Sequence, residues 1–177
     1  MTLIVGLTGC IGSGKSAASQ WFETQGINVV DADIVAREIV EKGQPALAQI
    51  QSAFGDWVLL ESGELNRKAL REHIFQHPFA RQQLEEITHP AIRQSIIVQL
   101  EQANSPYVIL VSPLLFETNQ HLLTQRTLLI DASIELQIQR ASQRDGQSVA
   151  QIENIIQAQM PRDRKLDLAD DIAINDG

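Results

Sequence analysis

The sequence predicts an α/β fold with a mostly parallel sheet, because short apolar runs alternate with helical segments along its 177 residues. These runs carry few polar side chains, as strands do when both faces of a parallel sheet are covered. The first run, residues 3–7, leads straight into a glycine-rich turn and then into a helical segment. This order of strand, turn and helix predicts that the turn lies at the carboxyl edge of the sheet.

The apolar runs and the helical periodicity together give an order of elements. Five strands are expected, at residues 3–7, 27–30, 107–111, 127–131 and 172–174. Helices are expected at residues 16–25, 34–41, 134–144 and 149–160. Ser133 is a candidate N-cap of the third helix, and Gly146 follows its end. Residues 46–104 have helical spacing with one interruption at residues 62–64, and Pro78 and Pro90 each stand where a helix could begin.

The helical stretch of residues 46–104 is too long to be one crossover between neighbouring strands, so we interpret it as a helical insertion. The nucleotide-binding core is then expected to comprise residues 1–45, 105–135 and 168–177. Residues 136–167, which follow the fourth strand, are interpreted as a lid region.

Composition limits the possible partners. The chain has 22 acidic and 14 basic side chains, a net charge of −8, which repels nucleic acid and anionic lipid. Its one cysteine, Cys10, cannot form an intrachain disulfide, which fits a reducing cytoplasm. No apolar run approaches the ~20 residues that span a bilayer, and the N-terminus does not have the pattern of an export signal. We therefore expect a cytoplasmic protein with no nucleic-acid or membrane partner.

Residues 9–16 read GCIGSGKS and match the pattern G-x-x-x-x-G-K-[ST] in full. Glycines let the backbone turn tightly and direct successive N–H groups at one anion, and the following helix adds its positive N-terminal end. Lys15 supplies a charge for the β- and γ-phosphates of ATP, and Ser16 supplies a hydroxyl ligand for Mg²⁺. The residues expected to bind ATP are Ile11, Gly12, Ser13, Gly14, Lys15 and Ser16.

A phosphate loop alone does not distinguish a kinase from a switch or a motor. The Asn-Lys-x-Asp and Asp-x-x-Gly strings of GTPases do not occur in the sequence. A motor ATPase usually has an apolar strand that ends in Asp-Glu, whereas Asp131 is followed by Ala132, which is a partial match. A kinase for a small molecule needs an acceptor pocket, a carboxylate near the acceptor hydroxyl and arginines over the phosphates, and candidates for each are present.

Two carboxylates, Asp31 and Asp33, fall at the carboxyl end of the second predicted strand. In an open α/β sheet this edge faces the ligand crevice, so a carboxylate there can take the proton of an attacking hydroxyl. Asp33 is the favoured base. Asp31 is expected to cap the next helix or to orient the substrate.

Cations gather in the predicted lid. Arg140 and Arg144 are four residues apart on a predicted helix and so share one face, from which they can neutralise charge during phosphoryl transfer. Arg162, Arg164 and Lys165 add further cations after Pro161. The alternative interpretation of each arginine is a solvated basic surface.

Two further strings are ambiguous on residue chemistry alone. His89, between Thr88 and Pro90, is expected at the entry to a helix that begins at Pro90. Arg67, after the break at Gly63, can contact an anionic substrate or simply begin a helix.

Taken together, these strings resemble the dephospho-coenzyme A kinase family over nearly the whole chain. The resemblance is carried by GLTG and IGSGKS at residues 6–16, DAD and ARE at 31–38, GELNR at 63–67, ITHP at 87–90, PLLFE at 113–117, Gln137, Arg140, RD at 144–145, QM at 159–160, AD at 169–170 and NDG at 175–177.

The resemblance implies a P-loop NTPase fold in three layers, with a five-stranded parallel sheet, a helical coenzyme-A-binding insertion and a lid. It implies transfer of the γ-phosphoryl group of ATP to the ribose 3′-hydroxyl of dephospho-CoA, with Mg²⁺. Separately from the resemblance, we expect a monomer. Asp33 would be the base, and Lys15, Arg140 and Arg144 would act on the phosphates. The implied contacts to the acceptor are Thr8, Asp31, Arg67, His89, Pro113, Leu114 and Leu115, and Asn175 lies on the adenine side.

Two departures from the family pattern accompany this resemblance. Cys10 stands where many members have glycine, at a loop position whose side chain is not expected to block phosphate binding. Family chains usually continue through a further helix beyond the position of Gly177, so the loop near Asn175 is expected to be incomplete or frayed. The alternatives to a dephospho-CoA kinase are another small-molecule or nucleotide kinase of the same fold and a non-catalytic nucleotide-binding switch.

Overall fold

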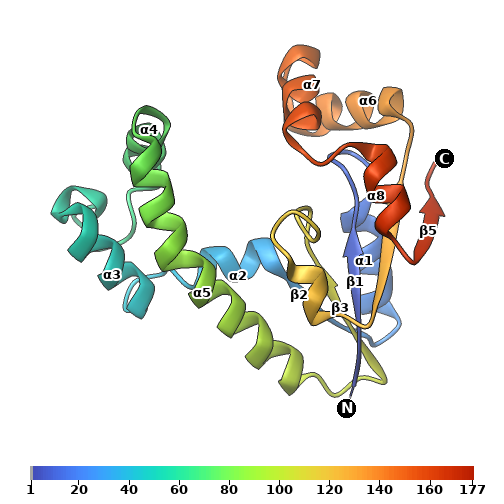
Figure 1. The fold of residues 1–177 in the computed structure, drawn as a ribbon, viewed down its shortest axis with the longest axis horizontal. Coiled ribbons are helices and arrows are strands. Elements are labelled where there is room, and N and C mark those ends of the chain that lie inside the picture. The colour runs from blue at the N-terminus through green and yellow to red at the C-terminus, as the bar shows by residue number, and fades with distance from the viewer. Residues whose placement is uncertain (1) are drawn as a thin grey trace. The chain divides into compact units, whose positions relative to one another are not determined.

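The computed structural model describes residues 2–177, and Figure 1 labels its helices and strands along the chain. The strands are β1 (Leu3–Thr8), β2 (Asn28–Asp31), β3 (Tyr107–Val111), β4 (Arg126–Asp131) and β5 (Asp171–Ile174). The α-helices are α1 (Lys15–Thr24), α2 (Ala32–Glu38), α3 (Pro45–Phe54), α4 (Arg67–Gln76), α5 (Pro78–Gln102), α6 (Ile134–Asp145), α7 (Val149–Ala158) and α8 (Arg162–Leu168). Two 3₁₀ helices, η1 (Asp56–Val58) and η2 (Gln120–Leu123), complete the elements.

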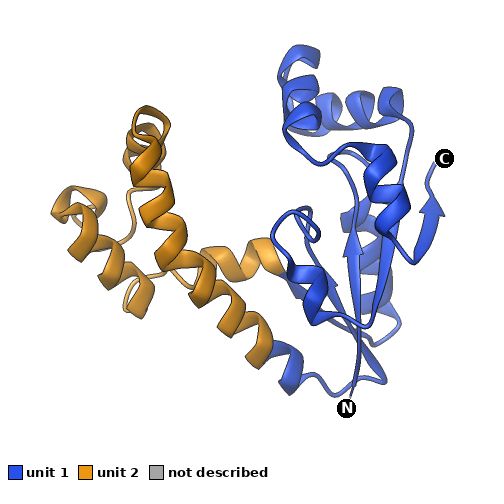
Figure 2. Cartoon of the chain, in the orientation of Figure 1, with its two compact units in different colours: residues 1–31, 99–177 blue, residues 32–98 orange. Residues whose placement is uncertain are grey.

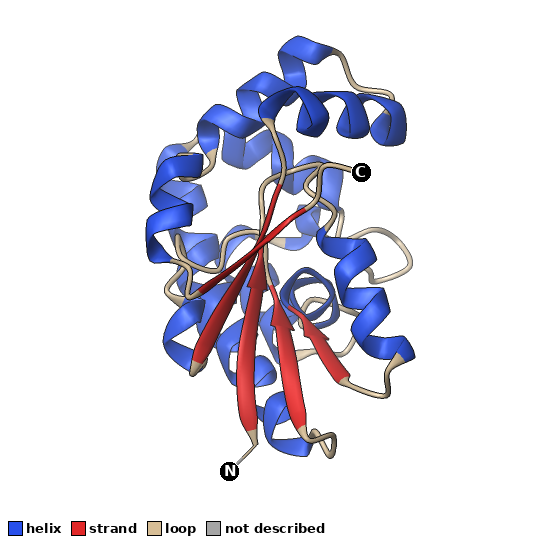
Figure 3. Ribbon diagram, turned by 90° about the vertical axis from the view of Figure 1, so that its right-hand side faces the viewer, coloured by secondary structure: helices blue, strands red, loops and turns tan. Residues whose placement is uncertain are grey.

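The five strands form one parallel sheet in the order β2-β3-β1-β4-β5. Strand β1 is central, with Leu7 opposite Val111 of β3 and opposite Leu128 of β4. In Figure 3 the strands, drawn in red, fan out next to one another and show the twist of the sheet. This confirms the predicted α/β class with a five-stranded parallel sheet, and it puts the strand that enters the glycine-rich turn in the middle.

The sheet core is built from the β-branched and leucine side chains of the predicted strands. Leu7 and Ile109 are fully buried in it, as the two-sided covering of a parallel sheet requires. Helix α1 covers one face through Ala18 and Phe22, and the Phe22 ring meets Tyr107 edge-on with centroids 6.3 Å apart. This packing holds the start of α1 at the end of β1.

The chain divides into two compact units, which Figure 2 distinguishes by colour. Unit 1 contains the sheet and comprises residues 1–31 and 99–177, and unit 2 comprises residues 32–98. Unit 2 is helical and has its own buried side chains, among them Val35, Ile50, Val58 and Ile96. Within it, Leu59 and Leu65 form an isolated antiparallel bridge, and the Asn66 side chain caps α4 by accepting from the Ala69 amide.

The prediction that a helix begins at Pro90 is wrong, because His89 and Pro90 lie inside the 25-residue helix α5. Pro78 is the residue at which this helix begins. A proline within a helix removes one amide donor, here for the carbonyl four residues earlier. The length of α5 on both sides of Pro90 outweighs this loss. The structure also adds α8, a short polar helix without an apolar stripe, which the sequence pattern did not predict.

Across residues 2–177, no helix combines the length and the apolar character that crossing a bilayer requires.

Candidate nucleotide-binding site

The glycine-rich turn connects β1 to α1 and is shaped by two residues with positive φ. Gly12 has φ 72°, and Gly14, the N-cap of α1, has φ 102°. A Cβ at Gly12 would lie 2.3 Å from the Gln137 carbonyl oxygen, and one at Gly14 would lie 2.3 Å from Asn175 Nδ2. The positive φ favours glycine at both positions, and at Gly12 the nearby backbone of Gln137 also leaves no room for a side chain.

Lys15 folds its side chain back over the turn. Its Nζ donates to the carbonyl oxygens of Gly9 at 2.8 Å and of Cys10 at 3.1 Å. The ammonium is thus held at the mouth of a loop whose amides precede a helix N-terminus. An anionic phosphate oxygen is a stronger acceptor for an ammonium than a neutral carbonyl, so a polyphosphate can take these donors.

Two hydroxyls beside the turn have no hydrogen-bond partner among the described residues. Thr8 and Ser13 are fully buried, and neither Thr8 Oγ1 nor Ser13 Oγ has a partner. Buried hydroxyls are nearly always hydrogen-bonded. Their presence beside a phosphate loop provides polar groups for a bound ligand or water.

Asn175, which follows β5, ties the C-terminal segment to the turn. Its Nδ2 donates to the Ser13 carbonyl at 2.9 Å, and its backbone amide donates to the Asp131 carbonyl at 2.8 Å. Arg140 Nη1 donates to the Asn175 carbonyl at 3.0 Å. The expectation of a frayed loop is therefore not met at Asn175, because both its side chain and its backbone are hydrogen-bonded.

Asp131, at the end of β4, is paired with a cation that the sequence did not assign to it. Its two oxygens accept from Arg162 Nε and Nη2, each at 2.7 Å. The hydrogen bonds from Arg162 to Asp131 raise the pKa of that guanidinium above its ordinary value. This bidentate pair occupies the carboxylate that partly matched a motor ATPase, which weakens that alternative.

The remaining predicted side chains fall into two groups. Within unit 1, Arg144 is exposed and donates two hydrogen bonds to its neighbour Asp145. Arg140, by contrast, contacts Asn175, the residue that is hydrogen-bonded to the glycine-rich turn. The Asp145 carboxylate raises the pKa of Arg144, and the hydrogen bonds from Arg144 lower the pKa of Asp145. Asp31 is the last residue of β2, at the carboxyl edge of the sheet.

Three predicted residues belong to unit 2. Asp33 is exposed in the first turn of α2, two residues after β2 ends. Arg67 is the first residue of α4, and its Nη2 donates to the Arg37 carbonyl at 3.4 Å. His89 is exposed within α5. Arg67 also lines a cavity of about 500 Å³ inside this unit, with Val40, Glu41, Lys42, Leu60, Glu64 and Leu65.

The turn after β3 contains the predicted residues Pro113, Leu114 and Leu115. Leu115 is fully buried, whereas Leu114 is 42% exposed. Ser112 Oγ accepts a hydrogen bond from the Leu114 amide at 3.2 Å. The Ser112 amide donates to the carbonyl oxygen of Leu7 in β1 at 3.0 Å. The turn is thus joined to the strand that leads into the phosphate loop.

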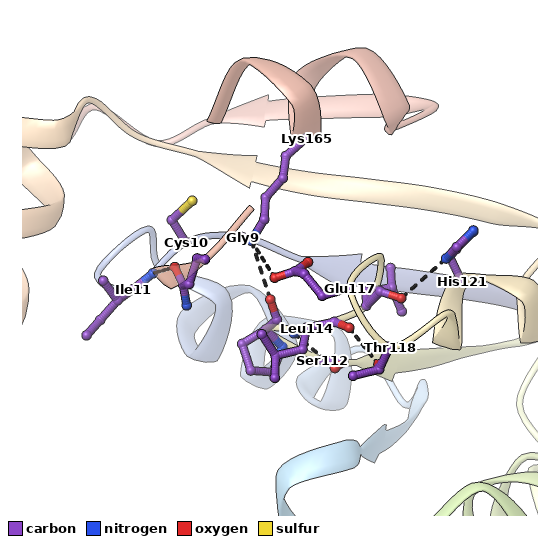
Figure 4. Close-up of polar contacts among 12 residues, drawn as sticks. Gly9, Cys10, Ile11, Ser112, Leu114, Glu117, Thr118, His121 and Lys165 are labelled. Atoms are coloured by element: carbon purple, nitrogen blue, oxygen red, sulfur yellow. Dashed lines mark hydrogen bonds and ion pairs between the residues drawn. The ribbon is translucent and has the colours of Figure 1, made fainter. Parts of the chain in front are cut away.

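Lys165 does not join the exposed cations of the predicted lid, because its side chain is fully buried. Its Nζ donates to the Pro113 carbonyl at 3.4 Å and lies 3.7 Å from Glu117 Oε2. Figure 4 shows the side chain reaching from its helix toward Glu117 and the turn around Leu114. Sequence analysis had no signal for this pair, since a lysine in a polar helix is ordinarily exposed.

A further side chain missed by the sequence analysis reaches the phosphate loop. The amide of Ile11 donates to Gln159 Oε1 at 3.3 Å. Gln159 also lines a cavity of about 320 Å³ together with Cys10, Ile134, Gln137, Ile156, Gln157, Met160, Pro161, Arg162 and Asp163. The only signal for Gln159 was its place in the string Gln159-Met160.

Comparison with known proteins agrees with this geometry. The family model described as dephospho-CoA kinase matches residues 3–177. A dephospho-CoA kinase of Acinetobacter baylyi is 74% identical over 174 residues, which cover 98% of this chain and 89% of that protein. A solved structure from Thermus thermophilus has a TM-score of 0.85 at 31% identity, covering 99% of this chain and 90% of the other. The solved dephospho-CoA kinase of Campylobacter jejuni has a TM-score of 0.73 at 29% identity, covering 100% and 90% respectively.

Proposed function

Because this chain belongs to the dephospho-CoA kinase family, we propose that it transfers the γ-phosphoryl group of ATP to the ribose 3′-hydroxyl of dephospho-CoA. The products are coenzyme A and ADP, so the reaction is the last step of coenzyme A synthesis. The observation that carries the proposal is the loop from Gly9 to Ser16, where Lys15 Nζ is held by two loop carbonyls beside the N-terminus of α1.

The loop amides and Lys15 bind the β- and γ-phosphates and offset the charge that spreads over the transferring group. Asn175 supports the backbone of the loop through Ser13, on the side assigned to adenine. Arg140 and Arg144 are proposed to act from α6, with Arg140 attached to the Asn175 carbonyl and Arg144 exposed beside Asp145.

A magnesium ion fits the donors at the start of α1. Ser16 is the second residue of the helix, directly after Lys15, and its side chain is exposed. Magnesium usually takes one or two protein ligands and completes its shell with phosphate oxygens and water, so a cluster of acidic residues is not needed. Ser16 is the proposed protein ligand, and the ion would draw charge from the phosphates.

On the acceptor side, Asp33 is the proposed general base for the 3′-hydroxyl, supported by its place just after the carboxyl end of β2. Asp31, Thr8 and the turn at Pro113–Leu115 are proposed to line the same side.

The helical residues 46–104 are proposed to bind the coenzyme A portion, and residues 136–167 are proposed to form the lid. Arg67 and His89 are the proposed acceptor contacts of the helical part. The cavity lined by Lys42 and Arg67 offers cations suited to an anionic substrate. We propose a cytoplasmic monomer, since one chain supplies Lys15, Arg140 and Asn175 to the nucleotide site.

The test measures ADP release with ATP and dephospho-CoA, and with nucleoside monophosphates as alternative acceptors. Turnover should require dephospho-CoA and should be abolished in Lys15→Ala, while the exposed-lysine variant Lys68→Ala retains it. If a nucleoside monophosphate is the better acceptor by orders of magnitude, the chain is a different kinase of this fold. Nucleotide binding without acceptor-stimulated turnover would instead support a switch.

A further inference from the structure

Helix α8 is fastened to the carboxyl edge of the sheet at two points. Arg162 donates two hydrogen bonds to Asp131 at the end of β4, and Lys165 donates one to Pro113, two residues beyond the end of β3. The two cations are three residues apart and therefore share one face of the helix. In the sheet, β3 and β4 are the two neighbours of β1. Helix α8 therefore connects the ends of the two strands that flank β1, the strand from which the phosphate loop emerges.

The Lys165 attachment is the more unusual of the two. Lysine is almost never fully buried unless it is paired, because removing an ammonium from water is costly. Here the side chain is completely buried, yet its only hydrogen bond to a described residue is the one to the Pro113 carbonyl. Its charge is balanced by Glu117, whose two oxygens are buried and accept no hydrogen bond from the described residues. Such a pair contributes little net stability compared with apolar side chains of similar size.

The pair instead fixes a particular segment. Both contacts of Lys165 fall on residues 113–117, the turn that follows β3. Strand β3 lies between β1, which leads into the phosphate loop, and β2, which ends at Asp31. The turn therefore leaves the sheet between the strand that presents the phosphates and the strand that leads to the proposed base.

We propose that Lys165 and Glu117 are positioning residues for phosphoryl transfer. Lys165, held on α8, fixes the turn at residues 113–117 and so sets the acceptor hydroxyl relative to the phosphate loop. The inference rests on the proposed function for its reaction, although the fixing of the turn is independent of the substrate. In this proposal neither residue binds the phosphates, and both act through the position of the turn.

The test compares Lys165→Met with Asp167→Asn, which removes a charge from an exposed position of the same helix. A displaced turn should lower kcat by ~10–10² and raise KM for dephospho-CoA, since small displacements of reacting groups cost this much. The Kd for ADP should stay unchanged, and ADP stoichiometry gives the active fraction. Partial unfolding would lower that fraction without changing KM, so the two causes are separable. Asp167→Asn should match the parent.

Glu117→Gln provides a second variant, because it keeps the size of the side chain and removes only the charge that balances Lys165. As in Lys165→Met, its kcat should fall while its Kd for ADP stays unchanged. This variant keeps the proposal testable if Lys165→Met does not fold. A folded Lys165→Met, or Glu117→Gln, with the parent's kcat and KM would overturn the proposal.

Amide hydrogen exchange separates this inference from the proposed function. Exchange of the amides of residues 114–117 should be faster in Lys165→Met than in the parent and unchanged in Asp167→Asn. If the parent does not phosphorylate dephospho-CoA, the proposed function fails while faster exchange still supports the attachment. If exchange in this turn is unchanged in Lys165→Met, the attachment itself is refuted.

Discussion

The side-chain amide of Asn175 donates a 2.9 Å hydrogen bond to the main-chain carbonyl of Ser13, which joins the segment after β5 to the phosphate loop. The same amide nitrogen occupies the space that a Cβ at Gly14 would need. The end of the chain and the loop near its start therefore depend on each other.

Gly14→Ala should weaken ADP binding strongly, because Gly14 has φ 102° and its new methyl group would lie 2.3 Å from Asn175 Nδ2. Either the loop or Asn175 must move. Gly26→Ala is the matched control, since Gly26 also has a positive φ of 77° but no atom within 4 Å of a new Cβ. It should cost about 1–2 kcal/mol of stability and leave ADP affinity unchanged. Titration calorimetry checks both variants, and equal ADP affinity for Gly14→Ala and the parent would contradict the prediction.

Asp33→Asn should lower kcat by ~10²–10⁴ with nearly unchanged ADP affinity, if Asp33 takes the proton of the acceptor hydroxyl. The amide keeps the shape of the side chain and cannot act as a base. Steady-state turnover with dephospho-CoA checks the prediction. Asp31→Asn is the comparison and should lose less activity. A larger loss in Asp31→Asn would move the base to Asp31.

Pro90→Ala should stabilise the protein by up to about 3 kcal/mol, because alanine supplies the amide donor that proline lacks within α5. Urea unfolding measures the change. Pro78→Ala is the control and should bring no such gain, since Pro78 is the first residue of the same helix, where amides have no intrahelical acceptor. An unchanged or lower stability of Pro90→Ala would mean that the surrounding packing depends on the proline ring.

The pair between Arg126 and Asp171 predicts an acid-sensitive contribution to stability. Arg126 Nη2 donates to Asp171 Oδ1 at 2.9 Å and Nε donates to Oδ2, and these hydrogen bonds lower the pKa of Asp171 below its ordinary 3.8. A carboxylate with a lowered folded-state pKa stabilises the fold above the unfolded-state pKa, and the effect is lost as the pH falls through the folded-state value.

At neutral pH, Asp171→Asn should therefore be slightly less stable than the parent, as expected of an exposed pair. The difference should shrink as the pH falls below about 4. Unfolding in urea across this range provides the measurement. Arg126→Gln removes the partner that lowers the pKa of Asp171 and should show the same dependence on pH. A difference that grows toward low pH would contradict the assignment.

The sequence was sufficient where local patterns determine structure. Strand β3 matches its predicted bounds, and α6 is capped by Ser133 and followed by Gly146 as expected. The phosphate loop could be predicted from its glycines and Lys15, because few other backbone conformations require these residues in this order. These features depend on residues close together in the chain, which is why one sequence can specify them.

The sequence was insufficient where distant residues decide the outcome. Pro90 has a local preference to begin a helix, which the packing of a long α5 overrides. Lys165 reads as an exposed cation until Glu117 and Pro113 are brought beside it by tertiary structure. Asp131 likewise gained a partner, Arg162, from 31 residues away. In each case the deciding neighbour lies outside any local pattern.

The central place of β1 also affects how the protein can be made. Its two partners, β3 and β4, begin at Tyr107 and Arg126, so residues 9–106 separate β1 from the first strand that can pair with it. During synthesis from the N-terminus, the strand leading to the phosphate loop therefore emerges from the ribosome long before it has a neighbour. Contacts between residues so far apart in sequence form slowly, so the apolar β1 remains without a partner strand for much of synthesis.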